Sequence, residues 1–240
     1  MCHSDESRPP SASTAVPVAS SSALELTAAD GNRVLAFEAR PATPNGAGIV
    51  VMPDVRGLHE FYKALAVRFA EVGVEAVAID YFGRTAPDDD RTEAFEFMPH
   101  VEKTTPEGVA ADVAAGVAQV TARGAGKVFT VGFCFGGGYS WRQSADTPGL
   151  AGCIGFYGRP ASGLEVADRM TTPLLMLVAG ADAHIPVEDV RAVADAAVVE
   201  AEFVVFDGAP HSFFDRSFAE HAAAADEAWT RIQSFMAAHS

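Results

Sequence analysis

Short apolar runs recur along the chain, and polar or glycine-rich residues follow each of them. The six runs cover residues 48–52, 74–79, 128–133, 150–156, 174–179 and 203–206. Runs of this length, rich in β-branched residues and apolar on both faces, are typical of buried parallel strands. An earlier segment, with residues 24–26 and 33–39 flanking Asp30-Gly31-Asn32, predicts a hairpin at one edge of the sheet.

Helical spacing of apolar residues occupies the segments between these runs. Phe61, Leu65 and Phe69 follow one another at intervals of four and predict a helix over residues 61–72. Similar patterns predict helices over residues 106–122, 187–199 and 218–236. Strands that alternate with helices indicate an α/β fold, in which a mostly parallel sheet is covered by helices on both faces.

The composition fits one globular domain with a tail. Of 240 residues, 49% are apolar and 20% are charged, which is enough to bury a large core. Residues 1–22 are rich in Ser, Pro and Ala and predict a flexible N-terminal arm, and no linker divides residues 23–240. The acidic stretch over residues 85–105 is a surface connection too short for a large lid domain.

The net charge limits the class of possible partners, and the cysteines indicate the cellular compartment. A net charge of −15 argues against a nucleic acid or an anionic membrane as partner, although a few arginines can still bind a small anion. The chain has no apolar run of the roughly 20 residues that span a bilayer, and no secretory signal. Three cysteines, an odd number without metal-type spacing, favour a reduced, cytoplasmic location. The oligomeric state stays open.

Reactive residues follow the predicted strands, where an open α/β sheet binds its ligands. Asp54 and Arg56 follow the first core run, and Arg84 follows the second. A cysteine, an aspartate and a histidine follow the third, fifth and sixth runs: Cys134, Asp182 and His211. A nucleophile, a carboxylate, an imidazole and two arginines at one sheet edge have complementary chemistry and indicate an active site.

The sequence Gly132-Phe133-Cys134-Phe135-Gly136-Gly137 matches the G-x-nucleophile-x-G turn of α/β-hydrolases, with cysteine in place of the usual serine. The turn puts the nucleophile at a helix start, where the backbone dipole favours a thiolate. The backbone N–H of Phe135 is one expected oxyanion donor, and that of Val55 is the other, with Arg56 as its alternative. The competing interpretation, a buried structural cysteine, fits this glycine-rich context less well.

The order of nucleophile, acid and histidine along the chain is that of the α/β-hydrolase triad. Asp182 comes 48 residues after Cys134, and His211 comes 29 residues after Asp182. His184 would place the base on the same loop as the acid, so it is interpreted as a rim or surface residue. No third ligand joins the isolated His and acid pairs, so no metal is expected.

At these residues the chain resembles the dienelactone hydrolase family, over about residue 36 to the C-terminus. The landmarks are Met52-Pro53-Asp54-Val55-Arg56-Gly57, Asp80-Tyr81-Phe82-Gly83-Arg84, the Cys134 turn, Gly180-Ala181-Asp182 and His211-Ser212-Phe213. The resemblance implies an α/β-hydrolase fold, a Cys-His-Asp triad, no metal or organic cofactor, and the opening of dienelactones in the catabolism of chlorinated aromatics.

The resemblance also implies roles for four neighbouring residues. Asp54 holds the place of a family glutamate that contacts the resting thiol until substrate displaces it, and it is one methylene shorter. Arg84 matches the first of two arginines that bind the substrate carboxylate. Arg216 lies five residues after His211 rather than the family's four, and is the candidate for the second. Arg56 is a further candidate for substrate binding.

The sequence therefore predicts a hydrolase that cleaves a lactone or ester bearing a carboxylate, through a thioester on Cys134. Two alternatives stay open. One is a general carboxylesterase or thioesterase that uses the same triad. The other is a non-enzymatic thiol sensor or binding module.

Overall fold

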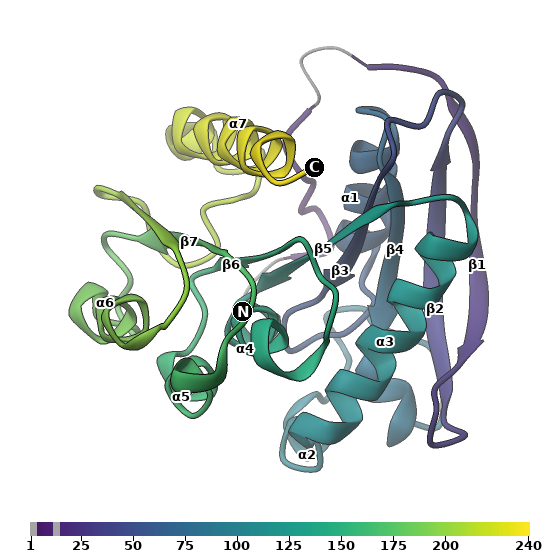
Figure 1. The fold of residues 1–240 in the computed structure, drawn as a ribbon, viewed down its shortest axis with the longest axis horizontal. Helices are drawn as coiled ribbons and strands as arrows, with labels where there is room; N and C mark the ends of the chain where they lie inside the picture. The colour runs from purple at the N-terminus through teal and green to yellow at the C-terminus, as the bar shows by residue number, and fades with distance from the viewer. Residues whose placement is uncertain (1–3, 12–14) are drawn as a thin grey trace.

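A single twisted sheet runs through the centre of the computed structural model, which describes residues 4–11 and 15–240 (Figure 1). Its strands, in the order β1-β2-β4-β3-β5-β6-β7-β8, pair in parallel from β4 through β8, while β1 and β2 are antiparallel. The strands are β1 (Val18–Thr27), β2 (Arg33–Pro41), β3 (Ala47–Met52), β4 (Glu75–Asp80), β5 (Lys127–Phe133), β6 (Gly152–Phe156), β7 (Leu174–Ala179) and β8 (Ala201–Phe206).

Helices cover both faces of this sheet. They are α1 (Glu60–Ala70), α2 (Met98–Val101), α3 (Pro106–Ala122), α4 (Phe135–Asp146), α5 (Pro160–Leu164), α6 (Val187–Ala196) and α7 (Ala222–Ala238). Buried side chains of α1 and α7 belong to one core, and those of α3, α4 and α6 belong to the other. Figure 1 shows α7 on one side of the sheet and α4, α5 and α6 on the other. This is the α/β-hydrolase architecture that the sequence predicts.

The alternation of side chains along each strand explains why the central runs are apolar throughout. In β3, Ile49 and Val51 point into one core, while Val50 and Met52 point into the other. All four are fully buried. Burial of such a side chain contributes about 1.5–3 kcal/mol, so both faces of the strand stabilise the sheet. The central strands are thus held firmly, and the loops at their carboxyl ends start from fixed points.

The two edges of the sheet differ from the sequence expectation. The sixth apolar run forms β8, an edge strand in which only Phe206 is buried, because a single strand neighbours it. At the other edge β1 begins at Val18, so the hairpin includes the last five residues of the expected arm. An edge strand needs cross-strand pairing rather than burial, and a polar Ser-rich stretch can provide that.

The first described residues lie against the domain. The Asp5 carboxylate contacts the imidazole of His59 at 2.9 Å. The backbone N–H of Arg8 donates to Asp215 at 3.1 Å, and the Arg8 carbonyl accepts from the backbone of Arg216 at 3.0 Å. Ser7 is buried. Residues 1–3 and 12–14 of the expected arm lie outside the described residues.

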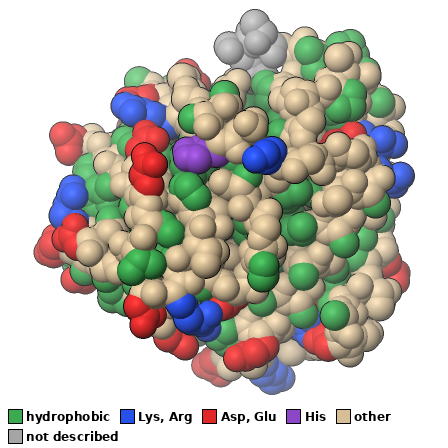
Figure 2. All heavy atoms as spheres, viewed as in Figure 1, with side chains coloured by type: hydrophobic (Ala, Val, Ile, Leu, Met, Phe, Trp, Pro, Cys, Tyr) green, Lys and Arg blue, Asp and Glu red, His purple; other side chains and the backbone are tan. Residues whose placement is uncertain are grey.

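The charge pattern on the surface is mixed. On the face drawn in Figure 2, the blue Lys and Arg side chains that the structure describes lie scattered among red acidic ones and form no continuous stripe. Among the described residues, no helix is long and apolar enough to cross a membrane.

Candidate active site

A cavity of about 600 Å³ opens at the carboxyl ends of the parallel strands. Its walls come from the loops after β3, β6, β7 and β8, from the start of α4, and from α2. The lining residues are Val55, Phe97, Met98, Val101, Cys134, Phe135, Arg159, Pro160, Ala161, His184, Ile185, Pro186, Asp189, His211 and Ser212. The cavity therefore combines a largely apolar surface with a thiol and an imidazole.

Cys134 sits at the tight turn between β5 and α4, as the glycine pattern predicts. Its backbone has φ 54° and ψ −111°, and its N–H donates to the carbonyl of Phe156 at 3.1 Å. A Cβ atom at Gly136 would overlap the carbonyl oxygens of Met52 and Pro53, so the turn and the loop after β3 can meet only at a glycine. The residue is nine-tenths buried yet lines the cavity.

Backbone strain in the described chain gathers at this cavity. Apart from glycines, the described residues with positive φ are Cys134 (54°), Tyr157 (35°) and Ser212 (66°). Cys134 and Ser212 line the cavity, and the Tyr157 ring packs on the His211 ring with 4.7 Å between centroids. Such conformations cost about 1–3 kcal/mol each and persist where the surrounding fold enforces them, typically at functional sites.

His211 and Asp182 form a short pair behind the cavity. His211 Nδ1 lies 2.6 Å from Asp182 Oδ2. The other Asp182 oxygen accepts from the backbone N–H groups of His184 at 2.9 Å and Ile185 at 3.2 Å. The Asp182 side chain is 2% exposed, whereas that of His211 is 20% exposed. The carboxylate is thus fixed from two sides while the imidazole reaches the cavity.

These contacts also set the charge of the carboxylate. Burial raises the pKa of Asp182, but the hydrogen bonds from His211 and from the His184 and Ile185 backbone outweigh burial, and the pKa lies below its ordinary value. Asp182 is therefore ionised at neutral pH. An ionised carboxylate on Nδ1 holds the proton there and leaves Nε2 as the basic nitrogen.

The two expected oxyanion donors belong to residues that line the cavity, Val55 and Phe135. Gly136, the residue after Phe135, lies close to the carbonyls of Met52 and Pro53, at the start of the loop that carries Val55. Within the described chain, neither backbone N–H donates a turn or loop hydrogen bond. Paired N–H groups of this kind can stabilise a developing negative charge on a carbonyl oxygen.

The arginines predicted to bind substrate lie elsewhere. Arg84 ends a 3₁₀ turn after β4, and its guanidinium forms a two-pronged pair with buried Asp112 at 2.7 and 2.8 Å and contacts Asp30 at 2.6 Å. Arg216 is exposed and contacts Ser11 at 3.3 Å. Neither lines the cavity. Their roles in substrate binding stay predictions, and Arg84 has a structural partner in the fully buried Asp112, which requires a cation.

Asp54 and Arg56 are buried beside the loop residue Val55 and do not line the cavity themselves. Asp54 is fully buried, accepts from the backbone N–H of Arg56 at 2.9 Å, and lies 3.4 Å from the Arg56 guanidinium. Arg56 is 2% exposed. The gating role of Asp54 stays a prediction, and its carboxylate already has a cationic partner.

Three features in or beside the cavity were not predicted from the sequence. Tyr157 packs on the catalytic candidate His211, and Arg159 lines the cavity two residues later. Both follow the fourth apolar run, so the rule that inspects strand ends, applied to that run, could have found them. The apolar wall formed by α2 gave no signal, because a four-residue helix shows no periodicity. His184, expected at the rim, does line the cavity.

No three His, Cys, Asp or Glu side chains of the described chain cluster in a way that could hold a metal ion. The cavity instead offers a thiol, an imidazole with a buried carboxylate, and two backbone N–H donors. This set suits attack on a carbonyl group, followed by proton transfer.

Comparison with known proteins identifies the family. A model of the "Dienelactone hydrolase family" matches residues 34–240. A "Putative carboxymethylenebutenolidase" of Escherichia coli (strain K12) is 29% identical over 221 residues, covering 84% of this chain and 81% of that protein. A "Probable 2-oxo-3-(5-oxofuran-2-ylidene)propanoate lactonase" of Bradyrhizobium sp is 28% identical over 231 residues, covering 88% of this chain and 91% of that protein.

A solved structure shows the same likeness. The structure described as a "Putative Dienelactone Hydrolase" from Klebsiella pneumoniae superposes with a TM-score of 0.77 at 28% identity, covering 91% of this chain and 99% of that one. The family model spans most of the described domain, including every residue of the cavity. The chain therefore belongs to the dienelactone hydrolase family and is a hydrolase that acts on ester or lactone bonds.

Proposed function

We propose that Cys134 is the nucleophile of this hydrolase and that His211 and Asp182 complete its triad. The observation that carries the proposal is the shared cavity: Cys134, on a strained turn, and His211, held by a buried carboxylate at 2.6 Å, both line it. A nucleophile, a base and a group that orients the base are the three parts that acyl transfer requires.

The proposed reaction has two halves. His211 Nε2 takes the proton of the Cys134 thiol, and the thiolate attacks the substrate carbonyl carbon, whose oxygen takes up the negative charge beside the N–H groups of Val55 and Phe135. The C–O bond then breaks, His211 Nε2 gives that proton to the departing oxygen, and a thioester remains. In the second half His211 Nε2 takes a proton from water as the hydroxide attacks the thioester, the C–S bond breaks, and the departing sulfur takes the proton back from His211.

The proposed substrate is a lactone or ester that carries a carboxylate, of the dienelactone type. The name of the Bradyrhizobium relative describes a lactonase for a propanoate, which is an anionic substrate. The apolar wall formed by Phe97, Met98 and Val101 suits an unsaturated carbon skeleton next to that charge. In a lactone the departing oxygen stays attached to the acyl chain, so the thioester intermediate keeps both ends of the substrate in the cavity.

The decisive experiment compares steady-state hydrolysis of a cis-dienelactone and of p-nitrophenyl acetate. Wild type, Cys134→Ala and Cys153→Ala are assayed in parallel. We expect Cys134→Ala to lose at least about 10³-fold in kcat/KM on both substrates. Cys153→Ala is the matched control. Its thiol is fully buried in a core, and burial raises the pKa of Cys153 to about 12, so its loss should leave hydrolysis intact.

The pattern of rates separates the alternatives. Cys134-dependent turnover that favours the lactone supports the proposed substrate class. Turnover of the simple ester alone keeps the triad and points to a general carboxylesterase or thioesterase. A Cys134→Ala variant that retains the wild-type rate would remove Cys134 as nucleophile.

A further inference from the structure

We propose that Arg159 is the residue that recognises an anionic group on the substrate. The inference deepens the proposed function and rests on its substrate class. Among the described residues that line the cavity, Arg159 is the only lysine or arginine. It is exposed, and within residues 4–11 and 15–240 the structure gives its guanidinium no ion pair.

The backbone of Arg159 is fixed relative to the nucleophile. Arg159 follows β6 and precedes α5, and its carbonyl oxygen would lie 2.6 Å from a Cβ atom at Gly138. Gly138 belongs to the first turn of α4, whose preceding residue is Cys134. Close backbone contact of this kind holds the root of the arginine in place, while its long side chain remains able to follow the substrate.

The rival arginines are engaged elsewhere. The guanidinium of Arg84 is shared between Asp112 and Asp30, and moving it would leave the fully buried Asp112 without its cation. Arg56 is 2% exposed and paired with Asp54. The exposed guanidinium of Arg216 contacts Ser11 in the N-terminal segment. Only Arg159 combines a place on the cavity wall with a charge that a substrate carboxylate can neutralise.

Asp189 gives the cavity a second, opposite charge. It lies in the first turn of α6, it is exposed, and it lines the cavity without forming a salt bridge to Arg159. A substrate anion is therefore attracted toward Arg159 and repelled from Asp189. Removing the charge of Arg159 should weaken the preference for an anionic substrate, and removing the charge of Asp189 should strengthen it. Two variants with opposite expected effects therefore test the inference.

The first test measures charge selectivity with 4-acetoxybenzoate, an anionic ester, and its neutral methyl ester. The quantity compared is the ratio of the two kcat/KM values, in which the intrinsic reactivity of each ester cancels between variants. Arg159→Gln should lower this ratio about tenfold, and Asp189→Asn should raise it about twofold to threefold. Arg33→Gln, an exposed arginine on β2, is the matched control and should leave the ratio unchanged.

A second readout does not require hydrolysis. Alkylation of the Cys134 thiol by anionic iodoacetate is compared with alkylation by neutral iodoacetamide, and the Cys134 peptide is quantified by mass spectrometry. The iodoacetate-to-iodoacetamide rate ratio should fall about threefold to fivefold in Arg159→Gln, and 0.5 M salt should reduce the wild-type ratio. If wild type hydrolyses neither ester, the proposed function fails while this ratio still decides on Arg159.

Two results would overturn the inference. One is an active enzyme in which Arg159→Gln changes both kcat/KM values equally and leaves the alkylation ratio as in wild type. The other is a loss of anion preference in Arg216→Gln but not in Arg159→Gln, which would return the role to the arginine that the sequence resemblance indicates.

Discussion

In the part of the chain that the structure describes, two histidine rings each contact an aspartate side chain, and one of them, His211, lines the cavity with Cys134. His211 lies 2.6 Å from Asp182, and His59 lies 2.9 Å from Asp5. The exposure of the partners is reversed. In the first pair the carboxylate is 2% exposed and the imidazole 20%, whereas in the second the imidazole is 2% exposed and the carboxylate 49%.

The second nitrogen of each ring explains the difference. His59 Nδ1 accepts a hydrogen bond from the backbone N–H of Phe61 at 3.1 Å and so caps the start of α1. Both of its nitrogens are therefore used by the fold. In His211 the nitrogen opposite Asp182 belongs to a ring that lines the cavity with Cys134. The two pairs thus differ in which partner is accessible, since the imidazole of His211 reaches its cavity whereas His59 is buried behind an exposed carboxylate.

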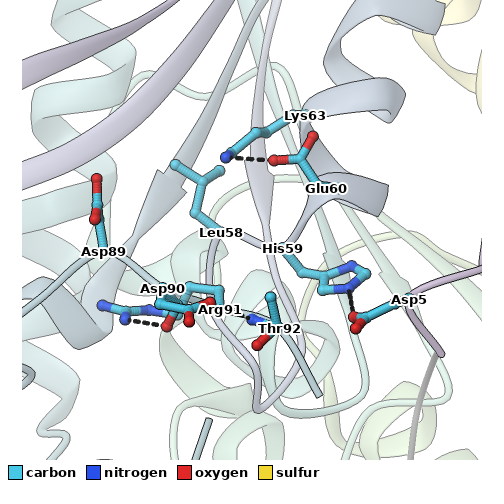
Figure 3. Close-up of a pocket in the computed structure, with 9 residues that line it drawn as sticks. All are labelled: Asp5, Leu58, His59, Glu60, Lys63, Asp89, Asp90, Arg91 and Thr92. Carbon is cyan, nitrogen blue, oxygen red and sulfur yellow. Dashed lines mark hydrogen bonds and ion pairs between the residues drawn. The ribbon is translucent and has the colours of Figure 1, made fainter. Parts of the chain in front are cut away.

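The surroundings of His59 support this contrast. Beside His59 lies a hollow of about 330 Å³. Figure 3 shows the residues that line this hollow, with Lys63 paired with Glu60 and Asp5 in contact with the imidazole. The described lining of this hollow contains no cysteine or serine. Its lining carries four carboxylates against one lysine and one arginine. The contact of Asp5 with His59 joins the N-terminal segment to the start of α1.

The largest expected effect is a loss of kcat, measured when the aspartate of each pair is replaced by asparagine. Asp182→Asn should lower kcat about 10³- to 10⁴-fold, because an amide can donate to Nδ1 and then stabilises the wrong tautomer of His211. Asp5→Asn, the matched variant, should change kcat less than twofold. Steady-state kinetics on p-nitrophenyl acetate measures both. Equal losses in the two variants would contradict the distinction drawn between the two pairs.

A smaller effect is expected on stability when His59 is replaced. His59→Ala should lower the free energy of unfolding by about 1–2 kcal/mol, because α1 loses its cap and a buried side chain leaves a gap. In a chain of this size that corresponds to a Tm lower by roughly 2–8 °C. His59→Asn, which keeps a capping oxygen, should recover part of the loss in thermal unfolding. Unchanged kcat in both variants is the control, and a Tm as in wild type for His59→Ala would refute the structural role.

The smallest expected effect is a dependence of stability on pH. Burial lowers the pKa of His59, the positive charge of Arg56 lowers it further, and the contact with Asp5 only partly opposes them. The folded protein therefore binds this proton less readily than the unfolded chain, whose histidine has a pKa near the ordinary 6.5. The stabilisation is fully present above pH 6.5 and is lost as the pH falls through the lower, folded-state pKa.

The difference in unfolding free energy between wild type and His59→Asn isolates this contribution. We expect the difference to be constant at pH 7–8 and to shift against the wild type at pH 5–6, as measured by urea unfolding. A difference that does not vary with pH, or one that shifts in favour of the wild type on acidification, would contradict the assigned direction.

The features that the sequence predicted well depend on residues that are close together along the chain. The apolar runs recur as β3 to β8 within one to two residues at each end, because a strand buried on both faces can contain little else. The helix over Pro106–Ala122 matches its predicted range. The turn at Cys134 is local as well, since Gly136 is required where the backbone of the loop after β3 comes close. Family membership follows from the same landmarks.

The placement of Arg84 could not be predicted this way. Arg84 follows a strand, as a residue of the active site should, but a 3₁₀ turn over Tyr81–Arg84 directs it to Asp112. Asp112 lies 28 residues further along the chain, and nothing in the local pattern marks it as a buried carboxylate in need of a cation. Arg159 lines the cavity because β6 lies between β5 and β7, an order that emerges only when the sheet assembles.

By itself, then, the sequence determined the fold class, the turn that presents Cys134 and the order of the residues proposed as its triad. These features follow from periodicity, from glycine where side chains do not fit, and from the strand ends that an α/β sheet brings together. Only the tertiary structure decided which charged side chains are neutralised in the interior and which face the cavity. That outcome depends on partners distant in sequence. The burial of Asp112 makes its ion pair with Arg84 obligatory, whereas Arg159 faces the cavity and is available to a substrate.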